Sequence, residues 1–256
     1  MRKFSACLEW LFADEAEEFS GRIRLAAKAG FEAFECWPWT NQDISKFEAA
    51  MRETGIALAS FVAEPMIPLT DPTNHPAFLE GLRRSAALAQ RLGARTLIAQ
   101  AGDDRPGVAR AEQRAALTQC LVKASDILRG SGVTLGLEPL NTRIDHIGYF
   151  LGTTVEGLDI VDEVGSPNVK IVYDVYHSAV MDELTERVLA GRIDRIAHLH
   201  AADHPGRNQP GTGRIDLAER LNWIFANGYD GYVGLEYRPV GGTSAGMADV
   251  LERLAG

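Results

Sequence analysis

Short apolar runs alternate with longer amphipathic stretches from one end of the chain to the other. The short runs are rich in β-branched and other apolar residues, which is typical of strands that are buried on both faces. Eight such runs are present, at residues 4–8, 33–36, 57–62, 96–100, 134–137, 170–173, 196–200 and 232–236. We therefore expect eight strands, each followed by a helical stretch.

The stretches between these runs have helical periodicity. In residues 78–92, apolar or small residues recur at three- and four-residue steps, namely at Phe78, Leu82, Ser85, Ala86, Ala89 and Leu92. Asp43 and Asp216 precede two other stretches and are candidate N-terminal caps. Gly55 and Gly93 follow two stretches, as glycine commonly does at the C-terminus of a helix.

Strict alternation of strands and helices implies parallel strands joined by crossover helices. Eight such units favour a closed barrel over an open sheet, and no GxGxxG motif follows the first strand. No Pro-, Gly- or Ser-rich linker divides the chain, and 256 residues is near the usual length of one (β/α)₈ barrel. We predict an α/β fold with a single TIM barrel domain over residues 1–256.

Composition narrows the class of function. Hydrophobic residues make up 46% of the chain and charged residues 24%, as in a globular enzyme. The net charge of −9 leaves no excess of cations for nucleic-acid phosphates, although a site can be locally positive. No apolar run approaches the ~20 residues of a membrane span, and we expect no signal peptide. Three widely spaced cysteines without a CxxC motif indicate reduced thiols, so we expect a cytoplasmic protein without nucleic-acid or membrane partners.

Candidate chemistry lies at the strand ends, because the active site of a (β/α)₈ barrel is built at the carboxyl ends of its strands. Four late strands end in Glu138, Asp174, His200 and Glu236. On neighbouring strands, these side chains would converge near the barrel axis. Buried charges must be paired or coordinated, so the set favours a metal site over helix caps or pairs with arginines. Mostly oxygen ligands with one histidine suit Mg²⁺, Mn²⁺ or Co²⁺.

A glycine accompanies each glutamate of this set. Side chains alternate between the two faces of a strand, so Gly136 shares its face with Glu138, and Gly234 shares its face with Glu236. We expect the space one layer below each glutamate to leave room for an ion and a ligand.

Four segments of the chain resemble a known superfamily of barrels. They are LEPLN at 137–141, YDVYH at 173–177, HLHAADHPGRNQPGTG at 198–213 and GYDGYVGLEYRP at 228–239. Together they resemble the xylose isomerase-like barrels, and within these the hydroxypyruvate isomerase family. The resemblance is strong over roughly the second half of the chain and looser before it, and the part at 205–213 is the most specific.

The resemblance implies an aldose–ketose type isomerisation of a small hydroxy-carbonyl acid or sugar, within carbohydrate metabolism. It implies that Glu138 and Glu236 are the catalytic pair. In metal-dependent relatives the ligands would be these two glutamates together with Asp174 and His200. Two further side chains stand where ketose epimerases bind the oxygens of their substrate, and these are His177 and Arg207.

Two departures from the hydroxypyruvate isomerase pattern affect the expected substrate. Those isomerases have a glutamine where this chain has His200, whereas the metal-dependent epimerases have a histidine there. The loop at 64–71 also lacks the Gly/Trp-rich lid of a typical hydroxypyruvate isomerase. A ketose 3-epimerase, a lyase or dehydratase, and a non-catalytic sugar-binding barrel therefore remain alternatives. An apurinic endonuclease-like activity is disfavoured. Enzymes of that kind resemble a three-zinc site, which needs more histidines at the strand ends than this chain has, and they need a basic groove.

The reaction implied by the resemblance sets requirements on the two glutamates. A proton must leave a carbon next to a carbonyl and another must arrive at the neighbouring carbon. A divalent ion polarises the carbonyl and stabilises the enediolate oxygens. We expect Glu138 and Glu236 to transfer the proton.

Other residues have two interpretations each. His198 shares a face with His200 one layer deeper, and we expect a supporting or core histidine there rather than a ligand. Arg207 would bind a substrate carboxylate or order its own loop. Glu64 would line the pocket or cap the next helix, and we expect Asn141 to orient Glu138. Three tryptophans would wall a sugar-sized pocket or pack at the rim, and these are Trp10, Trp37 and Trp39. The helix face at 222–225 could make a homo-oligomer contact.

Overall fold

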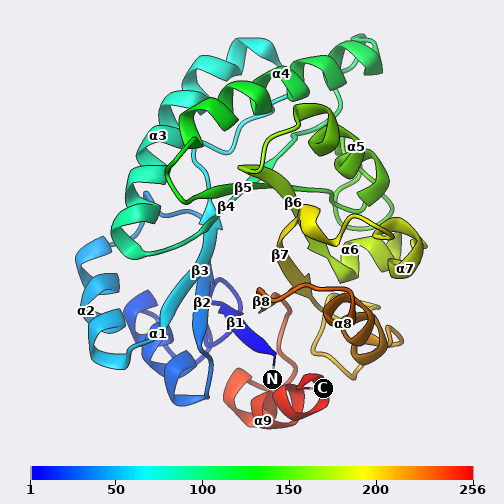
Figure 1. Ribbon diagram of the computed structural model, residues 1–256. Helices are drawn as coiled ribbons and strands as arrows, with labels where there is room; N and C mark the ends of the chain where they lie inside the picture. The colour runs from blue at the N-terminus through cyan, green and yellow to red at the C-terminus, as the bar shows by residue number, and fades with distance from the viewer. Residues whose placement is uncertain (1, 256) are drawn as a thin grey trace.

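A computed structural model describes residues 2–255, and the strands in this range form a closed parallel barrel (Figure 1). Each strand pairs with the next along the chain, and β8 closes the barrel by pairing with β1. The strands are β1 (Lys3–Cys7), β2 (Ala33–Cys36), β3 (Ala57–Val62), β4 (Thr96–Gln100), β5 (Thr134–Glu138), β6 (Val169–Asp174), β7 (Ile196–Ala201) and β8 (Tyr232–Leu235).

Helices surround the barrel on its outer side (Figure 1). The α-helices are α1 (Phe19–Lys28), α2 (Ile44–Thr54), α3 (His75–Leu92), α4 (Arg110–Leu128), α5 (Thr154–Val164), α6 (Val175–Val180), α7 (Thr185–Val188), α8 (Leu217–Ala226) and α9 (Thr243–Leu254). Short 3₁₀ turns precede α3 at Pro72–Asn74 and β7 at Ile193–Arg195. The predicted (β/α)₈ barrel is therefore confirmed, and the predicted strands agree with the observed ones to within a residue or so at most ends.

Local signals in the sequence account for several helix ends. The side chain of Asp43 accepts hydrogen bonds from main-chain N–H groups at the start of α2, and Asp216 does the same for α8. Gly55 and Gly93 end α2 and α3 with positive φ angles of 74° and 77°, which glycine adopts without the strain of a Cβ. All six periodic positions predicted for α3 are buried.

Alternate side chains of each strand face two different environments. One set packs against the helices and forms the large hydrophobic core, as Phe34, Leu137 and Leu199 do. The other set points into the barrel, where a separate apolar cluster contains only Val62, Ile98 and Val172 among the described residues. The barrel interior is therefore mostly polar.

The expectation of an exposed apolar face at 222–225 is wrong in part. Ile224 is fully buried, and Trp223 and Phe225 are half-buried and pack against the main core. The guanidinium of Arg2 covers the Phe225 ring at 5.2 Å. The helical period places these side chains toward the barrel, which leaves Asn222 as the exposed member.

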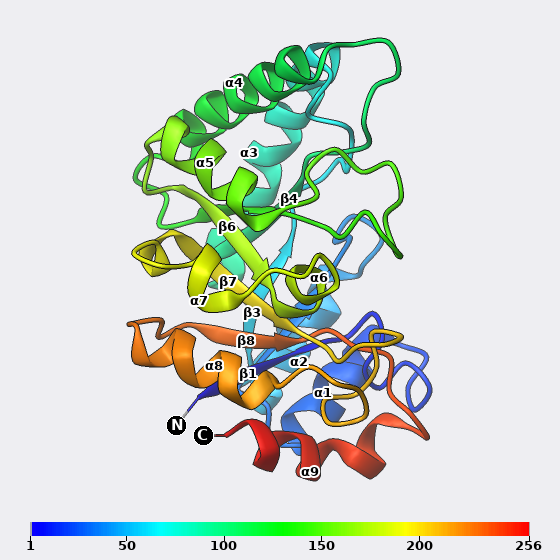
Figure 2. The ribbon, with the colours of Figure 1, turned by 90° about the vertical axis from the view of Figure 1, so that its right-hand side faces the viewer.

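Long loops gather at one end of the barrel, toward which the strands point (Figure 2). They follow β1, β3, β4, β5 and β7, whereas β6 runs directly into α6. Within residues 2–255, no helix has the length and apolar character needed to cross a membrane. The candidate site is thus built from strand ends and these loops.

Helix α3 packs so closely against the loop after β3 that its Gly81 has no space for a side chain. A Cβ at this position would lie 2.0 Å from the main-chain oxygen of Glu64. At Gly246 in α9, a Cβ would meet only the flexible amide of Gln209, at 2.5 Å. The two glycines therefore form a matched pair, one fixed by backbone packing and one not.

We expect Gly81→Ala to lower the free energy of unfolding by about 2 kcal/mol, since the cost of overpacking exceeds the gain in helix propensity. Gly246→Ala is expected to stay within about 1 kcal/mol of the wild type, because the Gln209 side chain can move and alanine favours the helix. Urea denaturation of both variants measures this. If both substitutions lowered the free energy of unfolding equally, the close contact between Gly81 and the loop after β3 would not be the cause of the loss.

Candidate active site

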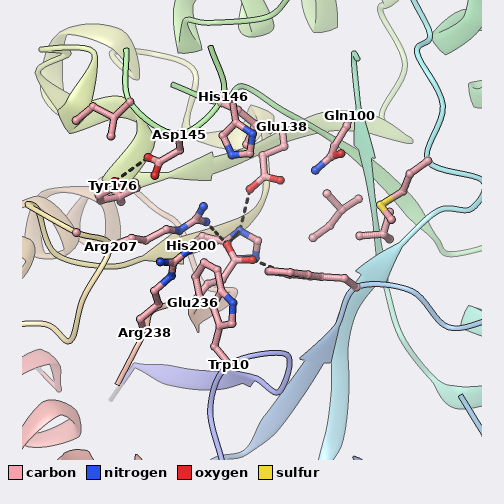
Figure 3. A pocket seen from close by; sticks show the side chains of 17 residues that line it. Trp10, Gln100, Glu138, Asp145, His146, Tyr176, His200, Arg207, Glu236 and Arg238 are labelled. Atoms are coloured by element: carbon pink, nitrogen blue, oxygen red, sulfur yellow. Dashed lines mark hydrogen bonds and ion pairs between the residues drawn. The ribbon is translucent and has the colours of Figure 1, made fainter. Parts of the chain in front are cut away.

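Four side chains converge at the carboxyl ends of β5–β8, and they are Glu138, Asp174, His200 and Glu236. Each offers an oxygen or nitrogen atom, and these atoms all lie within 4.8 Å of one another. All four residues are buried, the most exposed at 5%. Figure 3 shows Glu138, His200 and Glu236 directed toward a common point. The convergence expected from the strand ends is therefore present.

His200 links the upper and lower parts of this cluster. Its Nδ1 lies 2.9 Å from Glu138 Oε1 and 3.2 Å from Glu236 Oε2, while its Nε2 lies 2.9 Å from Glu35 Oε2. Burial alone would lower the pKa of this imidazole, but the surrounding carboxylates outweigh burial and raise the pKa well above 6.5. His200 therefore carries a positive charge between three glutamates.

Arg207 supplies a second buried cation. Its Nη2 donates to Asp174 Oδ2 at 2.9 Å and also to Glu236 Oε2. Its guanidinium lies over the rings of Trp10 and Tyr176, at 5.2 and 5.4 Å from their centroids. The structure thus brings Arg207 into direct contact with the strand-end carboxylates.

His177 lies beside Arg207 at the start of α6. Its Nδ1 accepts from the main-chain N–H of Asn141 at 3.2 Å, and its Nε2 lies 2.9 Å from Arg207 Nη1 and 3.5 Å from Asp174 Oδ2. Burial and the nearby guanidinium hold the pKa of His177 well below 6.5, so the ring is neutral. The structure therefore joins His177 to the same cluster as Arg207.

The loop that carries Arg207 is held together by Asp203. Its carboxylate accepts hydrogen bonds from four main-chain N–H groups of the loop, those of His204, Gly211, Gly213 and Ile215. Arg207 itself has φ of 54°, in the left-handed region, which few residues other than glycine adopt. The sequence pattern did not predict this role for Asp203, although the residue lies next to the segment of most specific resemblance.

A buried glutamate that was not predicted, Glu35 of β2, lies beneath the cluster. Its Oε1 accepts hydrogen bonds from Ser5 and from His198 Nε2 at 2.9 Å. Its Oε2 accepts from Ser60 Oγ at 3.1 Å and from His200 Nε2 at 2.9 Å. Burial raises the pKa of Glu35, but the two imidazoles outweigh it and hold the pKa well below 4.5. A charged residue within an apolar strand was the signal in the sequence.

This arrangement corrects the expected role of Gly136 and Gly234. A Cβ at Gly234 would lie 2.3 Å from Glu35 Oε1 and 2.9 Å from His198 Nε2, and one at Gly136 would lie 2.7 Å from Val172 Cγ2. Side chains of the chain itself, rather than an ion or ligand, thus fill the space below the two catalytic candidates. His198 supports Glu35 from below, as expected of a histidine one layer deeper.

A cavity of about 400 Å³ opens above the cluster, within the usual size range for small-molecule sites. Trp10 (Figure 3) and Trp37 line it, and Trp37 Nε1 donates to Glu236 Oε1 at 2.7 Å. Trp39 instead lies outside the described lining and donates to Ser85 at 3.0 Å. Two of the three tryptophans therefore wall the pocket.

Two other expectations are corrected by the contacts observed. Glu64 neither lines the cavity nor caps α3, because its carboxylate binds the loop after β2 through the N–H groups of Trp39 and Thr40, each at 2.8 Å. Asn141 does not contact Glu138. Its side chain lies against His177 and donates to Asp145 Oδ2 at 2.7 Å.

The loop after β5 contributes cavity residues that were not predicted. Asp145 and His146 line the cavity together with Tyr176 of α6 (Figure 3). Tyr176 donates to Asp145 Oδ2 at 2.7 Å, which ties the loop to the helix. Loop residues have no strand period to place them, so the sequence pattern carried no signal for these contacts.

The cluster suits a divalent cation on the chemistry of its donors. Three carboxylates and one imidazole offer converging atoms, a set that hard divalent cations accept. Burial raises the pKa of Glu138 and of Asp174, and the negative charge of Glu236 adds to both shifts. Acidic groups thus exceed cations at this point, and a bound divalent ion would balance them.

The sequence of the chain matches one family model over residues 23–255, and its description is "Xylose isomerase-like TIM barrel". The chain belongs to this family. The resemblance stated from the strand-end segments is thereby confirmed. The cluster described above lies at the barrel end where TIM barrel enzymes carry their active sites.

Named relatives extend over nearly the whole chain. A putative hydroxypyruvate isomerase of Homo sapiens is 32% identical over 96% of this chain and 93% of its own length. Hydroxypyruvate isomerase of Escherichia coli (strain K12) is 29% identical over 96% and 97%. A 2-oxo-tetronate isomerase of Cupriavidus necator is 31% identical over 96% of each chain.

Solved structures show the same architecture. A protein of Brucella melitensis described as AP endonuclease, family 2, aligns with a TM-score of 0.91 and 28% identity, over 98% of this chain and 99% of that one. A 3-keto-D-glucoside 4-epimerase of Escherichia coli aligns with a TM-score of 0.85 and 21% identity, over 100% and 99%. The second likeness shows the fold alone.

Replacing Glu35 tests the charge that supports this xylose isomerase-like site from below. Glu35→Gln keeps the side-chain volume but leaves two imidazoles without their carboxylate, so we expect the metal-free protein to lose about 3 kcal/mol of unfolding free energy. Ser60→Ala, which removes one hydroxyl from the same carboxylate, is the control and should cost about 1 kcal/mol. Urea denaturation measures both.

The pH dependence of this loss has a defined sign. The pKa of Glu35 lies below 4.5, so its stabilisation is complete above pH 4.5 and is lost as pH falls further. The pKa of His200 lies above 6.5, so its stabilisation is complete below pH 6.5 and is lost as pH rises toward that raised pKa. The loss of unfolding free energy caused by Glu35→Gln is expected to be largest between pH 4.5 and pH 6.5. A loss that does not change with pH would contradict the ion pair between Glu35 and His200.

Proposed function

We propose that this chain is an isomerase that moves a carbonyl group between neighbouring carbons of a small hydroxy-carbonyl compound, with hydroxypyruvate or a 2-oxo-tetronate as the first substrates to test. The observation that carries the proposal is the pair of buried glutamates, Glu138 and Glu236, that face one cavity across His200. Relatives named as hydroxypyruvate and 2-oxo-tetronate isomerases over nearly the full length support it.

The two glutamates differ in their surroundings. Both oxygens of Glu236 are engaged, Oε1 by Trp37 and Oε2 by Arg207 and His200. Glu138 is held by His200 through Oε1, and burial raises its pKa above 4.5. We infer that Glu138 removes the proton and that Glu236 faces it as the second proton-transfer group.

These two carboxylates account for the protons that leave and join carbon atoms in the reaction. One carboxylate removes a proton from C3 of hydroxypyruvate and leaves an enediolate. A proton returns to C2 while the hydroxyl proton passes from O3 to O2, which gives the aldehyde isomer, tartronate semialdehyde. Arg207 lines the cavity, and we infer that it donates to substrate oxygens while neutral His177, 2.9 Å from Arg207 Nη1, supports it.

A divalent cation held by Glu138, Asp174, His200 and Glu236 would polarise the substrate carbonyl and stabilise negative charge on the enediolate oxygens. We propose that this ion is Mg²⁺, Mn²⁺ or Co²⁺. To bind the ion, His200 would give up the Nδ1 proton that it shares with Glu138 in the metal-free protein, and Arg207 would keep its contact with Asp174.

An endonuclease function is disfavoured despite the description of the Brucella melitensis structure. The chain has a net charge of −9. Nucleic-acid phosphates require a basic face, and a cavity of about 400 Å³ fits a small metabolite instead.

Glu138→Gln and Glu236→Gln are each expected to lower kcat by about 10²- to 10⁴-fold, because each removes a proton-transfer group without changing side-chain volume. Proton NMR in D₂O with hydroxypyruvate and a 2-oxo-tetronate measures deuterium incorporation and product formation together. Glu163→Gln, on the exposed side of α5, is the control. Near-native turnover in Glu236→Gln with metal still bound would overturn its assignment.

Removal of metal is the second test. Dialysis against EDTA is expected to abolish deuterium exchange, and Mn²⁺ should restore it, because the cation stabilises the enediolate. Calorimetry with Mn²⁺ is expected to show binding that Asp174→Asn weakens. Exchange that persists in EDTA would keep the glutamate pair and remove the metal from the reaction. A product inverted at C3 would instead indicate a ketose epimerase.

A further inference from the structure

Arg238 brings a free positive charge to the mouth of the cavity. It follows Glu236 by two residues, and both residues line the cavity (Figure 3). Within residues 2–255 its guanidinium has no carboxylate or hydrogen-bond partner and lies 5.4 Å from the centroid of the Trp10 ring. The proposed isomerisation by Glu138 and Glu236 makes no use of this group.

Arg207 offers a second donor beside the same indole. Its guanidinium lies 5.2 Å from the centroid of Trp10. Two of its nitrogens bind the buried cluster, but its Nε is buried and has no partner among the described residues. An unpaired buried N–H is costly, so a ligand atom that accepts from it would lower the free energy of the site.

The two arginines are held next to each other by the backbone. The main-chain N–H of Arg238 donates to the carbonyl of Arg207 at 2.9 Å, and residues 208 and 238 form a parallel bridge. The Arg207 loop is itself fixed by Asp203. Both side chains therefore leave neighbouring points of the main chain, and both lie against the same indole.

Two other arginines near this end of the barrel are paired. Arg143 binds Asp182, and Arg105 lies 3.4 Å from Asp71. Arg238 is exposed at the mouth of the cavity and has no such partner, so its charge is free to attract an anion that enters. Guanidinium groups bind carboxylates with particular strength, because both partners are charged and planar.

We propose that Arg238, with the Nε of Arg207, binds the carboxylate of the substrate, so that this site favours hydroxy-carbonyl acids over neutral ketoses. This inference rests on the proposed isomerase function. In a three- or four-carbon 2-oxo acid the carboxylate is bonded to the reacting ketone carbon. A carboxylate site must therefore open on the same cavity as the glutamate pair, and Arg238 lines that cavity.

The test compares an acid with its neutral analogue on the same carbon skeleton. Hydroxypyruvate and dihydroxyacetone differ only in a carboxylate against a hydroxymethyl group. Arg238→Met keeps an apolar stem over Trp10 and removes the charge, and Arg143→Met makes the same change at a paired arginine outside the cavity. Exchange kinetics by NMR in D₂O give kcat and KM, and calorimetry with D-glycerate measures carboxylate binding without turnover.

Arg238→Met is expected to raise KM for hydroxypyruvate and Kd for D-glycerate by about 10- to 100-fold, with kcat within about twofold. Activity on dihydroxyacetone, and every value for Arg143→Met, should match the wild type. Unchanged KM and Kd in Arg238→Met, or an equal loss on dihydroxyacetone, would overturn the carboxylate site. Wild-type protein that binds D-glycerate through Arg238 but exchanges no substrate proton would sink the isomerase function and leave the anion site standing.

Discussion

The compensation of buried charge is the constraint on which the site depends. Four carboxylates lie at or just below the carboxyl end of the barrel, at Glu35, Glu138, Asp174 and Glu236. Two side-chain cations of the described chain, His200 and Arg207, bind them directly. Because unpaired buried charge is expensive, every group of the cluster is oriented by its neighbours. These ion pairs orient the buried side chains, and the remaining excess of carboxylates is what a bound cation would balance.

The strand period explains what the sequence could predict. Alternate residues of a strand share a face, so the sequence alone was enough to place Glu138, Asp174, His200 and Glu236 at one end of the barrel. His198 could be placed one layer below for the same reason. Eight β–α units were also enough to predict closure of the barrel.

Contacts made by loops could not be predicted in this way. Asp145 reaches Tyr176, and Asp203 folds its own loop, through hydrogen bonds whose partners have no fixed spacing in the sequence. Glu35 has the strand period, but its partners come from β1, β3 and β7. The space beside Gly234 was expected to be open, but Glu35 fills it. Glu35 belongs to β2, so the sequence around Gly234 carried no signal for it.

The polar network inside the barrel joins side chains from the first strands and from the last strand of the chain. It begins with Ser5 in the first strand and includes Glu35 in the second, while Gly234 and Glu236 belong to the last. During synthesis, the early groups emerge long before the strand that completes their surroundings. A nascent chain that ends before β8 lacks Glu236 and the pairing of β8 with β7 and β1. The cluster of converging side chains is therefore complete only when the last strand has closed the barrel.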